Sequence, residues 1–121
     1  MWSYKKSFGN KGEKLAAEFL KRKNYKILKK NFRIWGGEID IVARDPVTRE
    51  IVFVEVKTRS KEFWQYIDET LSYTQKKFIN RAAKRYLYKN NLEEFDWRVD
   101  FIGIILDENG PSIVHFKAIE M

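Results

Sequence analysis

The chain of 121 residues has no cysteine, only two prolines and a single histidine. The lack of cysteine excludes disulfides, zinc–thiolate sites and cysteine nucleophiles. No apolar run approaches the ~20 residues that span a membrane, and the first residues lack the apolar core of a secretory signal. We therefore expect a cytoplasmic protein with no membrane partner, folded as a single domain over residues 1–121.

Positive charge is concentrated in the first third of the chain. Residues 1–35 hold 11 Lys/Arg against 2 Glu, whereas the remaining 86 residues hold 13 Lys/Arg against 15 Asp/Glu. A basic segment suits a polyanion partner, because each cation near a phosphate releases counterions. The charge favours a nucleic acid, with DNA as the first candidate, although a soluble basic protein without such a partner has the same composition.

The apolar spacing predicts seven elements. Helices are expected where apolar residues recur at i, i+3 and i+4, over residues 10–23 and 73–90. Strands are expected over residues 25–34, 38–43, 51–58, 97–106 and 112–118. Asn10 is the expected N-cap of the first helix, and Asn24 its end. The order αβββαββ predicts an α/β fold with a central mixed sheet flanked by helices.

Charged residues interrupt two of the apolar strands. Side chains alternate between faces along a strand, so Glu55 and Lys57 share one face, roughly 7 Å apart. In the preceding strand, Asp40 is expected on the face opposite to Ile39 and Ile41. Burial of charge among valine, isoleucine and phenylalanine is costly unless the charges are paired or hold a metal.

These charged residues suit a magnesium site. Mg²⁺ prefers oxygen ligands, which Asp40, Glu55 and the backbone carbonyl of Val56 can supply, and Mn²⁺ accepts the same ligands. Lys57 can orient an attacking water or stabilise developing negative charge. The pattern therefore predicts a phosphodiester hydrolase. Two structural alternatives stay open: Asp40 paired with an arginine, and Glu55 paired with Lys57 on an exposed strand.

Glu13 has two interpretations. The segment Asn10-Lys11-Gly12-Glu13 fits a capping box, in which Glu13 reaches back to the start of the helix. Glu13 also shares a helical face with Ala16 and Leu20, which is the face expected to pack on the sheet. In that position it could complete the metal site from the helix.

Together, Glu13, the Gly37-Glu38-Ile39-Asp40 segment and the Val54-Glu55-Val56-Lys57 segment resemble the active-site pattern of the PD-(D/E)xK restriction-endonuclease-like superfamily. More closely, the chain resembles the bacterial YraN-like family of uncharacterised endonuclease-like proteins, over residues 9–118. This resemblance implies a restriction-endonuclease-like fold. It also implies Asp40 and Glu55 as metal ligands, Lys57 as the catalytic lysine and Glu13 as an accessory acid. A more distant likeness to archaeal Holliday-junction resolvases suggests branched or structured DNA as substrate.

Further residues are candidates for contact with nucleic acid. They are basic, polar or aromatic side chains near the predicted site: Arg33, Arg59, Trp64, Gln75, Lys76 and Lys77. Gln75 stands where the resembled family usually has a lysine. Aromatic residues around Trp64 can stack on bases, or equally pack on the core or in a homodimer contact. The alternative to a nuclease is a non-catalytic nucleic-acid-binding module of a repair, recombination or uptake assembly.

Overall fold

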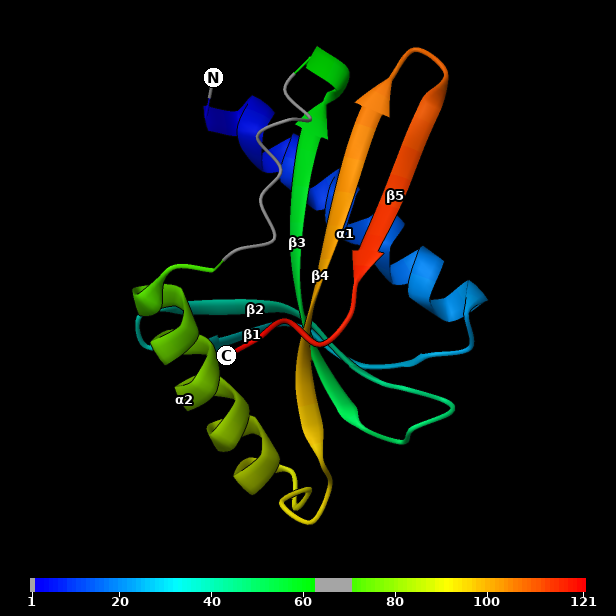
Figure 1. Ribbon diagram of the computed structural model, residues 1–121. Helices are drawn as coiled ribbons and strands as arrows, with labels where there is room; N and C mark the ends of the chain where they lie inside the picture. The colour runs from blue at the N-terminus through cyan, green and yellow to red at the C-terminus, as the bar shows by residue number, and fades with distance from the viewer. Residues whose placement is uncertain (1, 63–70) are drawn as a thin grey trace.

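The computed structural model describes residues 2–62 and 71–121, and its elements follow the predicted order (Figure 1). They are α1 (Trp2–Arg22), β1 (Lys26–Ile34), β2 (Gly37–Arg44), β3 (Ile51–Ser60), α2 (Tyr73–Lys89), β4 (Trp97–Asp107) and β5 (Gly110–Phe116). The predicted α/β class with a mixed sheet is confirmed. Within these residues, no helix is both long and apolar enough to cross a membrane.

The five strands form one sheet in the order β1-β2-β3-β4-β5. Neighbouring strands pair antiparallel except β3 and β4, which pair in parallel from Ile51↔Trp97 to Ser60↔Leu106. A parallel pair needs a crossover connection, and α2 lies in the chain between these two strands. In Figure 1, β3, β4 and β5 run alongside one another, while β1 and β2 bend away from them toward α2.

Each helix covers one face of this sheet and closes its own core. Ala16, Ala17 and Leu20 of α1 are buried against residues of β2, β3 and β4. The buried side chains of α2 belong to a second cluster on the other face, which contains Phe53 and Val99. The result is three layers, α/β/α, in which the central strands β2, β3 and β4 contribute side chains to both cores.

The first helix differs from the prediction at its start. It begins at Trp2, so Asn10 lies inside the helix and the predicted N-cap is wrong. Asparagine is a poor helix former but is tolerated within a helix, and residues 2–9 carried no apolar period that could reveal their helicity. The predicted end is correct: Asn24 takes a positive φ of 69°, and the Asn24 and Tyr25 N–H groups donate to Lys21 and Leu20 carbonyls. This is a Schellman motif.

The predicted alternation in β2 is also wrong. Ile39 packs in the core beneath α2, whereas Ile41 packs in the core beneath α1, although regular alternation would put both on one face. The cause is the bend of β2. Its pairing with β3 ends at Ile41↔Val54, and beyond this point β2 pairs only with β1.

Candidate metal centre

Asp40 lies where β2 and β3 separate. Its Oδ2 atom accepts a hydrogen bond of 2.7 Å from the backbone N–H of Val56. Because the regular β2–β3 pairing has already ended at Ile41↔Val54, the Asp40 carboxylate satisfies a β3 donor that the ladder leaves open. The bond ties Asp40 to the strand segment that carries Glu55 and Lys57.

Three carboxylates meet at this point. Glu13 of α1 and Glu38 and Asp40 of β2 place one oxygen each within 4.8 Å of one another, and all three side chains are partly buried. We call these three residues the acidic cluster. Two residues of β1 hold its outer members: Asn31 Nδ2 donates to Glu13 Oε1 at 2.7 Å, and Arg33 Nε lies 2.8 Å from Glu38 Oε2.

Glu13 reaches the cluster because α1 approaches β3 very closely. A Cβ atom added at Gly12 would lie 1.7 Å from Thr58 Oγ1 and 3.0 Å from Thr58 Cβ. Only glycine fits at such a distance. Since the helix begins eleven residues before Glu13, the capping-box interpretation of Glu13 is wrong. The position of Glu13 at the sheet agrees with the alternative, a contribution to the site from the helix.

The carboxyl group of Asp40 is largely removed from solvent and lies near other carboxylates, and both conditions affect its pKa. Burial is the main cause that raises the pKa of Asp40 to about 7, and the charges of Glu13 and Glu38 contribute to the rise. The hydrogen bond from the Val56 N–H opposes this shift without overcoming it. The pKa of Asp40 therefore stays well above its usual value, as for a carboxyl group in which burial disfavours the charged form.

Glu55 belongs to the same electrostatic site, although it is not one of the three clustered carboxylates. Burial raises the pKa of Glu55 to about 8, and the negative charge of Asp40 adds to the shift. Lys57 lowers the pKa of Glu55 in return. The Lys57 ammonium also lies 5.6 Å from the ring centroid of Phe101, on the neighbouring strand β4.

This donor set fits a hard divalent cation. All its side-chain ligands are carboxylate oxygens, which Mg²⁺ and Mn²⁺ prefer. A cation among them would relieve the repulsion that raises the pKa values of Asp40 and Glu55. The geometry brings Glu38 into the set, a residue that the sequence analysis did not assign. The signal was available, because Glu38 and Asp40 are two residues apart in a strand and share a face.

The predicted nucleic-acid contacts on α2 take part in local interactions. Gln75 closes a capping box: the Ser72 N–H donates to Gln75 Oε1 at 2.8 Å, and the Gln75 N–H donates to Ser72 Oγ at 3.1 Å. Lys77 lies with its Nζ atom 5.5 Å from the ring centroid of Tyr73. Neither residue contacts the acidic cluster, so their nucleic-acid role stays a prediction.

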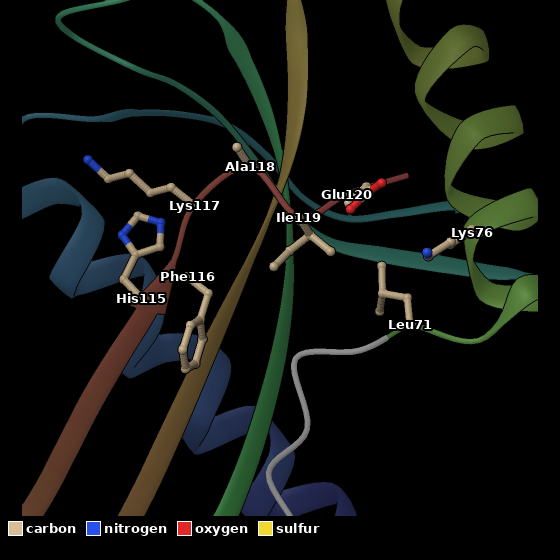
Figure 2. A pocket seen from close by; sticks show the side chains of 8 residues that line it. All are labelled: Leu71, Lys76, His115, Phe116, Lys117, Ala118, Ile119 and Glu120. Carbon is tan, nitrogen blue, oxygen red and sulfur yellow. The ribbon is translucent and has the colours of Figure 1, made fainter.

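Lys76 lines a cavity of about 620 Å³ (Figure 2). The cavity lies between the start of α2 and the C-terminal segment, and its walls are Leu71, Lys76, His115, Phe116, Lys117, Ala118, Ile119 and Glu120. No residue of the acidic cluster lines it, so this cavity is not the predicted metal site.

The remaining predicted contacts lie near β1 and β3. Arg33 is largely exposed and pairs with Glu38 at the edge of the acidic cluster. Arg59 Nη1 donates to the Thr58 carbonyl at 2.9 Å. Trp64 and its aromatic neighbours lie outside the described residues.

A second cluster of buried charge, centred on Arg98 of β4, lies apart from the acidic cluster. The guanidinium lies 2.8 Å from carboxylate oxygens of Asp45 and Glu50, and 3.0 Å from Asp100 Oδ1. His115 Nε2 lies 2.8 Å from the other Asp100 oxygen. We call these five residues the Arg98 network. The pairing ties His115 of β5 to Asp100 of β4 and so places it within the fold of the sheet, apart from the acidic cluster.

Comparison with known proteins identifies the family. Residues 12–104 match the sequence model described as "Uncharacterised protein family UPF0102". The chain belongs to this family. Relatives named UPF0102 protein include one from Geobacter metallireducens, 44% identical over 112 residues (93% of this chain, 90% of the relative). Another, from Pelobacter propionicus, is 42% identical over 108 residues (88% and 77%), and one from Alkaliphilus oremlandii is 41% identical over 114 residues (93% and 96%).

The residues that match the family model include those of the candidate metal centre. It begins at Gly12, which permits the close approach of α1, and includes the whole acidic cluster with Glu55 and Lys57. The family description names no activity. A function for this chain must therefore be argued from the chemistry of the site.

Proposed function

We propose that this protein is a metal-dependent nuclease that hydrolyses phosphodiester bonds of DNA, with Mg²⁺ or Mn²⁺ as cofactor. The observation that carries the proposal is the gathering of Glu13, Glu38 and Asp40 beside Glu55, where burial and mutual repulsion raise carboxylate pKa values. A site of this kind gains most from a divalent cation. The resemblance to restriction-endonuclease-like enzymes supports the same chemistry.

Asp40 and Glu55 would hold the metal, together with Glu38 and Glu13 and the Val56 carbonyl. When bound, the ion supplies Lewis-acid chemistry, in that it neutralises charge that develops on the phosphate. The Val56 N–H fixes the orientation of the Asp40 carboxylate. Asn31 does the same for Glu13 from β1.

Lys57 is the residue best placed to act on the reacting groups. It shares a face with Glu55 on β3 and is close enough to lower the Glu55 pKa. An ammonium group in this position can orient an attacking water or donate a hydrogen bond to an anionic phosphate oxygen. Among the described residues, no other basic side chain is indicated as catalytic by both the sequence pattern and the geometry.

DNA is the proposed polymer because of the charge distribution. The excess of Lys and Arg over residues 1–35 includes Arg33, which borders the acidic cluster. Cations beside an anionic site allow a polyanion to approach carboxylates that would otherwise repel it. Branched or otherwise structured DNA is the first substrate class to test, following the more distant likeness to junction resolvases.

The test is a cleavage assay with purified protein and supercoiled, single-stranded and four-way-junction DNA, with Mg²⁺, with Mn²⁺ and with EDTA. We expect metal-dependent cleavage that falls at least ~100-fold in Asp40→Ala and in Lys57→Ala, consistent with loss of charge stabilisation. Glu108→Gln, which removes an exposed carboxylate on the β4–β5 turn, is the matched control and should retain activity.

Two outcomes would overturn the proposal. Absence of cleavage on all substrates, together with salt-sensitive DNA binding in EDTA, would favour the non-catalytic binding module. Cleavage that survives equally in Asp40→Ala and Lys57→Ala would identify a contaminating nuclease or a different site.

A further inference from the structure

Among the side chains of residues 10–62 and 71–121, Trp35 is the most exposed large apolar one. It lies in the two-residue turn between β1 and β2, which is closed by the Ile34↔Gly37 pair, and 92% of its surface is accessible. Tryptophan is highly buried on average, because its large ring stabilises a fold only when it is covered. An indole left uncovered in this way contributes little to folding, so its position calls for another explanation.

Two residues of α2 contact the turn that carries the indole and hold its backbone in place. Arg81 Nη2 of α2 donates to the Trp35 carbonyl at 3.2 Å. The ring of Phe78 packs under the turn so closely that a Cβ atom at Gly37 would lie 3.2 Å from it, and Gly36 has a φ of +102°. The backbone at Trp35 is therefore fixed, while the side chain stays open to solvent.

Positive charge flanks the indole, and the acidic cluster is near. Arg33 precedes it by two residues and pairs with Glu38 of the cluster, and Arg81 lies beneath it. Asp40 follows Trp35 by five residues, which span at most ~18 Å even when fully extended. Since phosphates along one strand of DNA are ~3.4 Å apart along the axis, this distance corresponds to about five nucleotides or fewer.

We propose that Trp35 is a stacking platform for an unpaired nucleobase of the DNA held at the acidic cluster. An aromatic ring flanked by cations is the usual arrangement for binding a splayed base and its phosphates. In a continuous duplex the bases are already stacked, and their extrusion costs a few kcal/mol. The site therefore favours DNA with unpaired bases, such as junctions, flaps and single strands. Tryptophan and arginine are also frequent at protein interfaces, but the neighbouring site proposed to act on DNA favours a base as the occupant.

This inference rests on the proposed function, and a binding assay without metal separates the two. The probes are a hairpin with a single-stranded 3′ extension that contains 2-aminopurine, and a fully paired duplex of the same length, both in EDTA. We expect tighter binding of the extended hairpin and quenching of its 2-aminopurine fluorescence. Trp35→Ala should weaken binding of the extended hairpin at least ~5-fold and abolish quenching, with little change for the duplex.

Two variants control for shape and exposure. Trp35→Phe keeps an aromatic ring and should retain most of the affinity. Tyr88→Ala removes another exposed aromatic residue, 71% accessible, which lies two helical turns (~10 Å) beyond Arg81 on α2. It should leave the binding of both DNA probes unchanged.

The outcomes distinguish the two proposals. If neither DNA binds, the proposed DNA substrate fails, and the stacking platform fails with it. If DNA is bound and cleaved while Trp35→Ala matches the parent protein on both probes, only the role of Trp35 is overturned. An equal loss on both probes would also overturn it, since that result indicates general contact with no preference for unpaired bases.

Discussion

The two charged clusters in this protein hold their carboxyl groups in opposite electrostatic states. In the Arg98 network, burial alone would raise the pKa of Asp100, but hydrogen bonds from His115, Arg98 and the Ala118 N–H lower it. The pKa of Asp45 is lowered for the same kind of reason. At the acidic cluster, burial and neighbouring anions raise the pKa of Asp40.

The difference is the presence of an internal cation. Arg98 supplies several N–H donors to three carboxylates, and its own pKa is raised by them in spite of its burial. The acidic cluster has the exposed Arg33 at its rim, and Lys57 acts on Glu55, yet the pKa values of Asp40 and Glu55 are still raised, first by burial and then by neighbouring anions. The carboxylates of the Arg98 network have an internal cationic partner, whereas under the proposed function those of the acidic cluster would be neutralised by a bound divalent cation.

The largest expected effect comes from removal of the internal cation. Arg98→Met should destabilise the protein by about 3–5 kcal/mol, because it leaves Asp100, which is fully buried, without its cationic partner. Urea unfolding followed by circular dichroism measures the change. Arg33→Met is the matched control: its pair with Glu38 is largely exposed and should contribute about 1 kcal/mol or less. Similar losses for both variants would remove the distinction between the clusters.

Addition of metal should act on the other cluster alone. At a Mg²⁺ concentration 100-fold above Kd, the folded state gains about 2.7 kcal/mol, or roughly 10 °C in Tm for a chain of this size. Thermal unfolding with Mg²⁺ and with EDTA measures it. Asp40→Asn should abolish the Mg²⁺ response, whereas Glu108→Gln, an exposed carboxylate, should retain it. An equal response in both variants would place the cation elsewhere.

Sequence reasoning predicted most of the fold because its signals were local. The period of Ala16 and Leu20 indicated which face of α1 is buried, and the apolar runs indicated five strands. It failed at β2, where Ile39 and Ile41 enter different cores. The bend that separates them comes from strand pairing across the sheet, which no local pattern records.

Local signals in the sequence also predicted part of the site. Asp40, Glu55 and Lys57 stood out because charge interrupted apolar strands. Glu38 was overlooked, although its two-residue spacing from Asp40 indicated a shared face. Asn31 did not stand out, because its role depends on the approach of α1, which brings Glu13 to the sheet. That approach requires Gly12, whose importance appears only when Thr58 is placed against it.

Gly12→Ala should show how far the acidic cluster depends on the close approach of α1 to β3, because this variant changes no charged residue. Alanine normally stabilises a helix by about 1 kcal/mol relative to glycine, but here its Cβ would collide with Thr58. We expect a net loss of about 1–3 kcal/mol and a weaker Mg²⁺ response, because α1 and Glu13 must move outward. Unfolding measurements with and without Mg²⁺ test both. The double variant Gly12→Ala/Thr58→Ala removes the colliding Oγ1 and should recover part of each. A stabilised Gly12→Ala would show that the close approach is not required.

The smallest effect concerns pH in the absence of metal. A carboxyl group whose folded pKa is raised, as for Asp40 to about 7, binds more protons in the folded state than in the unfolded state. Its stabilising contribution is present below the unfolded value of 3.8 and is lost as pH rises through the folded value. Asp40→Asn removes this titration, so in EDTA the variant should lose less stability between pH 5 and pH 8.

The comparison of the two clusters gives this pH experiment its control. Asp45→Asn alters a carboxylate of lowered pKa, whose contribution is already complete above its unfolded value, so this variant should be less stable at both pH values by a similar amount. Asp40→Asn should instead gain on the parent protein by an amount on the order of 1 kcal/mol at pH 8. If Asp40→Asn behaves as Asp45→Asn does, Asp40 already has an internal partner, and the argument for an external cation fails.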